Sequence, residues 1–123
     1  MSTAFEAITT RQSWHAAEEI AKYNAVEFNA EGKYVNAVGE GQFVGIAQYG
    51  AENIDDMVTV VKGTFPAISS EDLAAGDNVT IDTDNAGLFK KAGVGDAIYG
   101  KALTGVIEGN LFTLAMADVP VAE

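Results

Sequence analysis

The stretch Val44-Gly45-Ile46-Ala47 constrains this chain most, because it recurs as Tyr99-Gly100-Lys101-Ala102. A shift of 55 positions carries Gly45 onto Gly100, and the same shift also superposes other small and aromatic residues. These further matches are Gly32 with Gly87, Tyr34 with Phe89, Ala37 with Ala92 and Ala47 with Ala102. A run of matches at one offset indicates an internal repeat.

The match continues on both sides after small changes of offset. With a shift of 53, residues 18–21 lie over residues 71–74, and with a shift of 54, residues 57–60 lie over residues 111–114. The changes of offset fall where we expect turns, and turns tolerate insertions. The two similar halves that we expect are residues 18–61 and residues 71–116.

Length and composition favour a single all-β domain. A chain of 123 residues with 48% hydrophobic residues can bury one core. Its 13 Gly and only 2 Pro separate short apolar runs, a pattern typical of many short strands joined by turns. We therefore predict a small β-barrel or sandwich built from two similar halves, in which Gly45 and Gly100 mark equivalent bends.

The repeat also suggests how the rest of the chain divides. We expect an extended N-terminal arm over residues 1–17, a β domain over residues 18–117 and a polar C-terminal tail over residues 118–123. A helix that begins at Ser13 and runs to Ala21 is an alternative. We prefer an arm followed by one short helical turn, since Ile20-Ala21 aligns with Leu73-Ala74 just before an expected strand.

The charge excludes two classes of partner. Asp and Glu number 18 against 7 Lys and Arg, which gives a formal net charge of −11. Such a surface repels phosphate groups, so we expect no direct nucleic-acid binding and no attachment to an anionic membrane. We see neither an apolar run long enough to cross a bilayer nor a signal peptide, and the absence of Cys fits a reducing compartment.

Nothing in the sequence predicts an enzyme, a cofactor or a metal site. His15 is the only His, and no Ser lies in a Gly-x-Ser-x-Gly elbow. The stretch that begins at Asp82 starts like a calcium loop, but Ala86 and Gly93 stand where that loop needs ligands. We therefore interpret residues 82–87 as a turn.

Large aromatic residues on the polar arm have two interpretations. Phe5 and Trp14 have no obvious place in a core formed by the repeat. They fold back on their own barrel, or they anchor the arm on a partner, as buried aromatic residues do at interfaces. The composition of the arm does not separate these two possibilities.

Several segments together resemble the phage capsid cement, or head decoration, protein family. The resemblance runs from about Ile20 to Met116, and it depends on the order and spacing of its pieces. These pieces are Glu31-Gly32-Lys33, Phe43-Val44-Gly45-Ile46-Ala47, Val58-Thr59-Val60-Val61-Lys62-Gly63, Leu73-Ala74-Ala75-Gly76-Asp77-Asn78-Val79, Gly87-Leu88 and Gly100-Lys101-Ala102-Leu103.

The resemblance implies a mostly β protein on the outer surface of a phage head, made in the host cytoplasm. It implies a homotrimer that binds the major capsid protein and stabilises the shell, partly through the N-terminal arm. The arm residues that we expect at the capsid are Phe5, Ile8, Arg11, Trp14 and His15.

Two alternatives remain open. The chain could be another structural part of the virion, such as a head fibre base or a tail component. It could instead be a ligand-binding β-barrel, for example one that binds sugars, and an aromatic surface formed by Tyr34, Tyr49 and Tyr99 would favour this alternative. We expect Tyr34 inside, because its repeat partner is Phe89.

Overall fold

The described residues, 7–122, form strands, turns and loops and contain no helix in the computed structural model. The nine strands are β1 (Ala7–His15), β2 (Ala25–Phe28), β3 (Tyr34–Asn36), β4 (Phe43–Tyr49), β5 (Met57–Ile68), β6 (Asn78–Ile81), β7 (Phe89–Lys91), β8 (Ala97–Ala102) and β9 (Leu111–Ala122). The prediction of an all-β, barrel-like fold is confirmed.

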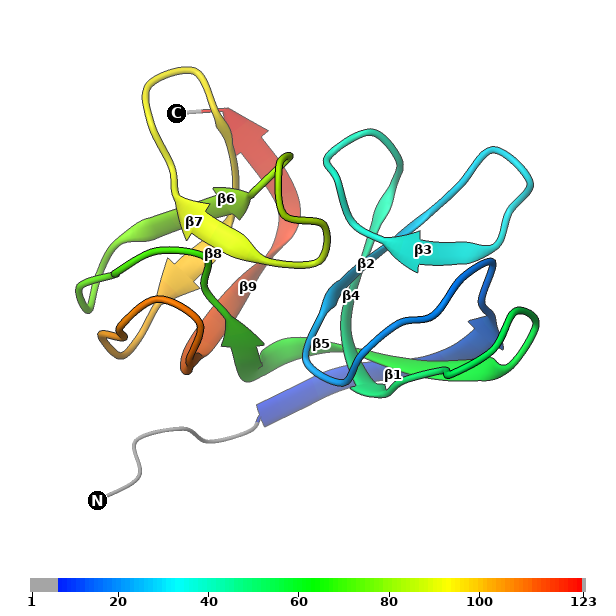
Figure 1. Ribbon diagram of the computed structural model, residues 1–123. Coiled ribbons are helices and arrows are strands. Elements are labelled where there is room, and N and C mark those ends of the chain that lie inside the picture. Colours follow the sequence, from blue (N-terminus) through cyan, green and yellow to red (C-terminus); the bar gives the residue numbers. More distant parts are fainter. Residues whose placement is uncertain (1–6, 123) are drawn as a thin grey trace.

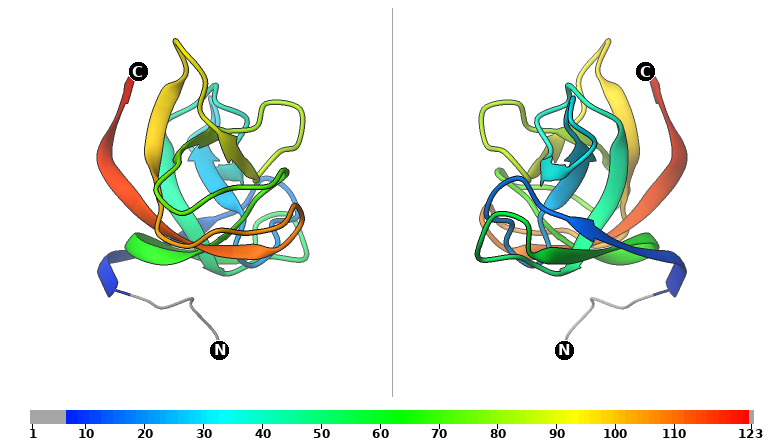
Figure 2. Two further views of the ribbon diagram at one scale, coloured as in Figure 1. Left: turned by 90° about the vertical axis from the view of Figure 1, so that its left-hand side faces the viewer. Right: turned by 90° about the vertical axis from the view of Figure 1, so that its right-hand side faces the viewer.

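All the strands belong to one curled antiparallel sheet. Its order is β3-β2-β4-β5-β9-β8-β6-β7, and β1 pairs with β5 beside this path. Figure 1 shows β2, β3 and β4 on one side of the molecule and β6, β7 and β8 on the other, with β5 running between them. The curl of the sheet is visible when the molecule is turned by 90° about the vertical axis (Figure 2).

The two sides of the molecule make the same pairings. An antiparallel bridge joins Ile20 to Ala51 on one side, and an equivalent bridge joins Leu73 to Val106 on the other. A parallel bridge likewise joins Ala16 to Tyr34, and its counterpart joins Ser69 to Phe89. Each parallel bridge connects the segment that enters a half to the edge strand of that half, which is β3 in the first half and β7 in the second. Each half therefore curls round on itself.

Residues that precede the expected repeat take part in these equivalent pairings. The sequence pattern predicts that residues 1–17 lie outside the repeat. In the structure, however, Arg11 pairs with Val61 in the same way as Thr64 pairs with Ala115. The second part of β5, residues 64–68, therefore corresponds to residues 11–15 of β1. The structure thus places Ala7–His15 within the sheet, while the proposed division into arm, domain and tail stays a prediction.

The prediction of a short helical turn after the N-terminal arm was wrong. Residues 18–22 and 71–75 are bends, turns and isolated bridges. Ile20 exchanges two backbone hydrogen bonds with Ala51, at 2.9 and 2.8 Å, and Leu73 does the same with Val106. These long-range bonds occupy the N–H and C=O groups that a helical turn would need for itself.

The C-terminal end also differs from a tail that leaves the sheet. β9 continues to Ala122, and its last part pairs with β8 through Val121 and Ala122. The sequence pattern predicted a strand only as far as Met116. β5 and β9 are each 12 residues long, which is a further likeness between the halves.

The repeated glycines allow neighbouring strands to approach closely. A Cβ atom on Gly45 would lie 2.2 Å from the carbonyl oxygen of Val61, and one on Gly100 would lie 2.4 Å from that of Ala115. Both distances are too short for any side chain to fit without movement of the backbone. Gly45 in addition has a φ of 141°, which favours glycine. The glycines that marked the repeat are therefore required at the equivalent bends.

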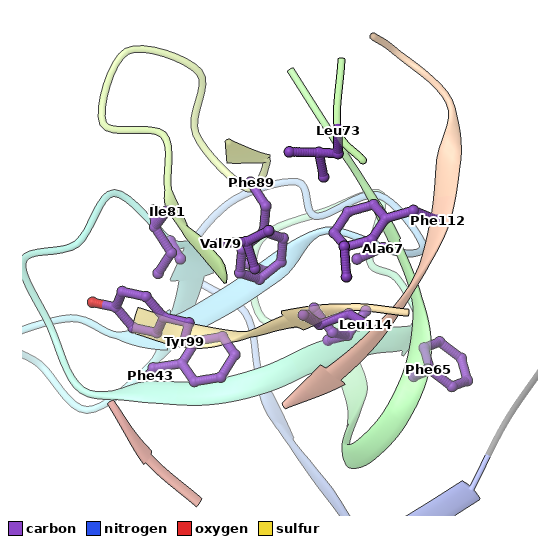
Figure 3. Packing of buried hydrophobic residues seen from close by; sticks show 14 of the residues in the cluster. Phe43, Phe65, Ala67, Leu73, Val79, Ile81, Phe89, Tyr99, Phe112 and Leu114 are labelled. Carbon is purple, nitrogen blue, oxygen red and sulfur yellow. The ribbon is translucent and has the colours of Figure 1, made fainter. Parts of the chain in front are cut away.

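Two groups of buried residues hold the sheet together. The smaller group fills the first half and includes Ile20, Tyr34 and Val58. The larger group fills the second half and extends to the first, because Phe43 packs against Tyr99 and Phe89 with ring centroids 5.2 and 6.4 Å apart. Figure 3 shows these aromatic rings close to one another in the centre of the molecule.

Candidate binding surface

β1 is unusual among the long strands because its side chains are exposed on both faces. All six residues from Thr10 to His15 are exposed, whereas Ala16 is fully buried. A strand that closes a barrel normally alternates between buried and exposed side chains. β1 is therefore the strand that offers most side chains to a partner, and it contains four of the five residues expected to bind a capsid.

Those five residues are not equivalent in the structure. Phe5 lies outside the described residues. Ile8 is partly buried and packs against the larger core, so it helps to attach β1 to the molecule. Arg11, Trp14 and His15 remain at the surface. Whether any of them contacts a capsid stays a prediction.

Arg11 makes no ion pair with a carboxylate of the described residues. Its Nε donates a hydrogen bond of 2.8 Å to Oε1 of Gln48 on β4, which lies on the other side of β5. The ion pair found in the described part of the chain joins Lys33 to Asp55 instead, at 2.6 Å. The Arg11 charge is thus held in place by a neutral group, and it stays available to an acidic partner.

Trp14 combines features of both interpretations of the arm. Its indole N–H donates a hydrogen bond of 2.9 Å to the carbonyl oxygen of Gly32, so the ring is attached to its own half. At the same time 48% of the residue is exposed, and the His15 ring lies edge-on to it at 5.4 Å. A half-exposed ring in a fixed position can bind a partner at a low entropic cost.

His15 is attached to the loop before β5. Its Nδ1 lies 2.9 Å from the carbonyl oxygen of Asp55. The hydrogen bond and charge of Lys33, with a smaller contribution from His15, hold the pKa of Asp55 below its ordinary value, against a weak opposing effect of desolvation. These contacts attach β1 to the loop before β5 and to the turn that carries Lys33.

A cleft of about 360 Å³ lies next to β1. Thr10 and Gln12 line it from β1, and Val60 and Lys62 line it from β5. The opposite wall comes from Phe28, Gln42, Phe43 and Val44. Lys62 is the one charged residue of this lining, and its Nζ lies 5.7 Å from the centroid of the Phe43 ring. The cleft therefore carries no negative charge, although the protein is strongly acidic.

No pattern in the sequence predicts this cleft. Thr10, Gln12, Gln42 and Lys62 form no motif, and the cleft exists only because β1 lies antiparallel along β5. A pairing between residues about fifty positions apart leaves no local signal. The weak signal that was present is the absence of Asp and Glu between Ala7 and Ala17 in an otherwise acidic chain.

Glu27 is a buried carboxylate that is explained by the fold. Glu27 is 3% exposed. The two oxygens of its carboxylate accept hydrogen bonds of 3.0 to 3.2 Å from the backbone N–H groups of Val38, Gly39 and Gly41. These bonds pair the charge and fix the loop between β3 and β4. Glu27 therefore has a structural role.

Asp82 likewise organises a turn, as the sequence indicated. Its carboxylate accepts hydrogen bonds from the Ser70 hydroxyl at 2.6 Å, the Asn85 side chain at 3.0 Å and the Asp84 backbone at 2.9 Å. Burial alone would raise the pKa of Asp82. These hydrogen bonds and the charge of Lys90 outweigh it, so the pKa lies below its ordinary value.

The tyrosines do not form an aromatic surface for a sugar. Tyr34 is 1% exposed and Tyr99 is 9% exposed, while Tyr49 is 61% exposed. Burial raises the pKa of both Tyr34 and Tyr99, with a smaller contribution from Glu27 at Tyr99. Tyr34 packs inside, as its repeat partner Phe89 predicted.

The described residues form neither a cluster of metal ligands nor a membrane-spanning helix. Residues 7–122 contain no cluster of three or more His, Cys, Asp or Glu side chains placed to hold a metal ion. Over the same residues, no helix has the length and apolar character needed to cross a membrane.

The fold is similar to that of a solved phage protein. The structure titled as the N base of the head fibre gp8.5 in bacteriophage phi29 superposes with a TM-score of 0.69. The match covers 93% of this chain and 98% of the phi29 chain, at 16% sequence identity. This likeness shows a shared fold. No protein family and no curated protein sequence matches the chain.

Proposed function

We propose that this protein is a structural component of a phage head, and that it decorates the outer surface of the capsid. The observation that carries this proposal is the agreement in fold, over nearly the whole chain, with a protein titled as a head fibre base. The resemblance of residues 20–116 to head decoration proteins supports the same conclusion from the sequence. At this level of identity the fold alone does not fix a function.

The proposed activity is physical. A protein that binds across neighbouring capsid subunits stabilises the assembled shell by mass action, because it binds the shell and not its separated parts. A homotrimer would place three copies of β1 on the shell, and linked contacts raise the overall affinity without one tight site. The net charge of −11 keeps such a surface away from DNA.

The partner in this proposal is the major capsid protein, and the proposed contact is the exposed side of β1. Arg11, Trp14 and His15 are exposed there and held by hydrogen bonds to their own half. Fixed side chains bind with a smaller loss of conformational entropy than mobile ones.

Binding to heads tests the proposal. Heads of the phage that encodes the protein are prepared without it, the purified protein is added, and bound protein is measured by co-sedimentation. We expect saturable binding and a higher temperature of DNA release from the decorated heads. Absence of binding to these heads would contradict a role on the capsid.

A second candidate is the base of a head fibre, and the likeness to the phi29 protein specifically favours it. The two candidates differ in what lies above the bound protein. Electron microscopy of the particle would show a fibre that rises from the bound protein if it is a fibre base. A decoration protein would leave a surface without fibres.

A further inference from the structure

Among the described residues, no strand pairs with the edge of β1 that faces away from β5. Ala16 donates its N–H to Asp56, next to β5, and Ala17 donates its N–H in the other direction, to Tyr34 of β3. N–H groups of successive residues in a strand point to opposite edges. Arg11, Ser13 and His15 therefore point their N–H groups to the same edge as Ala17, where β1 has no partner strand among the described residues.

The equivalent edge in the second half is closed by a proline. Ser70 donates its N–H to Phe89 of β7 at 2.8 Å, as Ala17 does to Tyr34. Four residues before Ser70 stands Pro66, and four residues before Ala17 stands Ser13. Proline has no N–H group and blocks the addition of a strand. Pro66 is also buried, whereas Ser13 is exposed, so only the first half keeps this edge open.

The surroundings of the open edge favour a negatively charged partner segment. Arg11 lies on β1, and Lys62 lines the adjoining cleft. The side chains that line this cleft include no carboxylate. A second cleft on the same half is lined by Glu18, Glu27 and Glu40, so the missing negative charge is specific to the β1 side. An acidic segment would gain from the attraction, and a basic segment would not.

A second copy of β1 fits this edge less well. Antiparallel pairing of two β1 strands about Ser13 would set Arg11 of one copy opposite His15 of the other. That arrangement provides no carboxylate opposite Arg11, so the pairing gains no attraction between opposite charges. The charge therefore favours a different protein.

We infer that the open edge of β1, from Arg11 to His15, binds an extended acidic segment of a partner protein as an added antiparallel strand. Main-chain hydrogen bonds to Arg11, Ser13 and His15 give the affinity, and the charge of Arg11, beside a cleft lined by no carboxylate, selects the acidic sequence. The inference rests on the proposed function only for the identity of the partner, which would be the capsid.

The test compares Ser13→Pro with Ser13→Ala. Both variants lose the bond of 2.9 Å between the Ser13 and Thr59 hydroxyls, but only proline removes the N–H from the open edge. The fold accepts proline at the equivalent position, Pro66. Equal thermal unfolding of the two variants is checked first. We expect Ser13→Pro to bind heads at least about tenfold more weakly than Ser13→Ala. Equal binding by the two variants would overturn the inference and leave the proposed function intact.

A peptide experiment keeps the inference testable if heads are not bound. The probe is a synthetic peptide in which Glu alternates with Val and Thr, and the control peptide carries Lys in place of Glu. We expect the Glu peptide alone to protect the amides of Arg11, Ser13 and His15 from hydrogen exchange, and Ser13→Pro to abolish this effect. Protection without binding to heads would support the inference and remove the proposed function. No protection by the Glu peptide, together with no binding to heads, would overturn both.

Discussion

The same strand position has opposite surroundings in the two halves. Phe65, Pro66 and Ala67 of β5 are buried, whereas their counterparts Gln12, Ser13 and Trp14 of β1 are exposed. Both segments pair in the same register with the last strand of their half. The difference lies in the cover. The second part of β5 lies against Tyr23 of the first half, whose ring centroid is 5.9 Å from that of Phe65. Residues 10–15 of β1 have no equivalent cover among the described residues and are exposed. A repeated backbone can therefore form core in one copy and binding surface in the other.

Truncation of the equivalent side chains should give the largest contrast. Phe65→Ala removes a ring that is 1% exposed, and we expect a loss of about 3–5 kcal/mol in the free energy of unfolding. Gln12→Ala, at the matching exposed position, should change it by less than about 0.5 kcal/mol. Urea unfolding of both variants checks this. Similar losses at the two positions would mean that β1 is covered in solution.

The two bends should respond alike to a methyl group. Gly45→Ala and Gly100→Ala both place a Cβ atom against a backbone carbonyl, at 2.2 and 2.4 Å, so we expect each to cost about 3 kcal/mol or more. Gly45→Ala should cost more, because a φ of 141° also strains alanine. Thermal unfolding ranks them. Gly32→Ala is a control for positive φ alone, since a Cβ there meets no atom within 4 Å.

The turns at Asn29 and Asp82 are equivalent but differ in charge. The folded pKa of Asp82 is lowered, so its stabilising effect is present above the ordinary value of 3.8 and is lost as pH falls through the folded pKa. We expect Asp82→Asn to cost about 1–3 kcal/mol at pH 7 and progressively less below pH about 4. Asn29→Ala should show no such pH dependence. Urea unfolding from pH 2 to 7 measures both, and a pH-independent loss at Asp82 would contradict the assigned role.

The smallest effect concerns the attachment of Trp14. Trp14→Phe keeps an aromatic ring but removes the hydrogen bond to Gly32, and we expect a loss of about 0.5–1.5 kcal/mol. Urea unfolding measures this loss, and the fluorescence of the only Trp follows the unfolding of the unmutated protein. If Trp14→Phe and Trp14→Ala were both neutral, the indole would not be attached to its own half.

The fold could be predicted from the sequence where the halves share side chains. Gly45 and Gly100, like Tyr34 and Phe89, occupy equivalent buried or crowded positions, and the same physical demand selects similar residues. The relation between β1 and the second part of β5 could not be predicted. Arg-Gln-Ser-Trp-His and Thr-Phe-Pro-Ala-Ile share a pairing register but meet solvent in one case and core in the other.

The candidate site was predictable only in part. Trp14 stood out as a large aromatic residue on a polar stretch, Arg11 was expected only through the family resemblance, and both are exposed in the structure. The cleft and the open strand edge depend on pairing between distant segments, so no window of the sequence contains them. The helical turn was predicted wrongly for the same reason, because the backbone groups of Ile20 and Leu73 bond to residues more than thirty positions away.

β5 is a single continuous strand that belongs to both halves. Its first part pairs with β4 of the first half, and its second part pairs with β9 of the second half. Neither half can be opened without removing a wall of its neighbour. Tension applied at one end of the molecule therefore crosses the middle along an unbroken peptide backbone, with the hydrogen bonds of β4 and β9 loaded in shear. Because the halves share this strand, the described part of the protein has no linker between them that could extend first under force. We expect the two halves to resist tension as one unit.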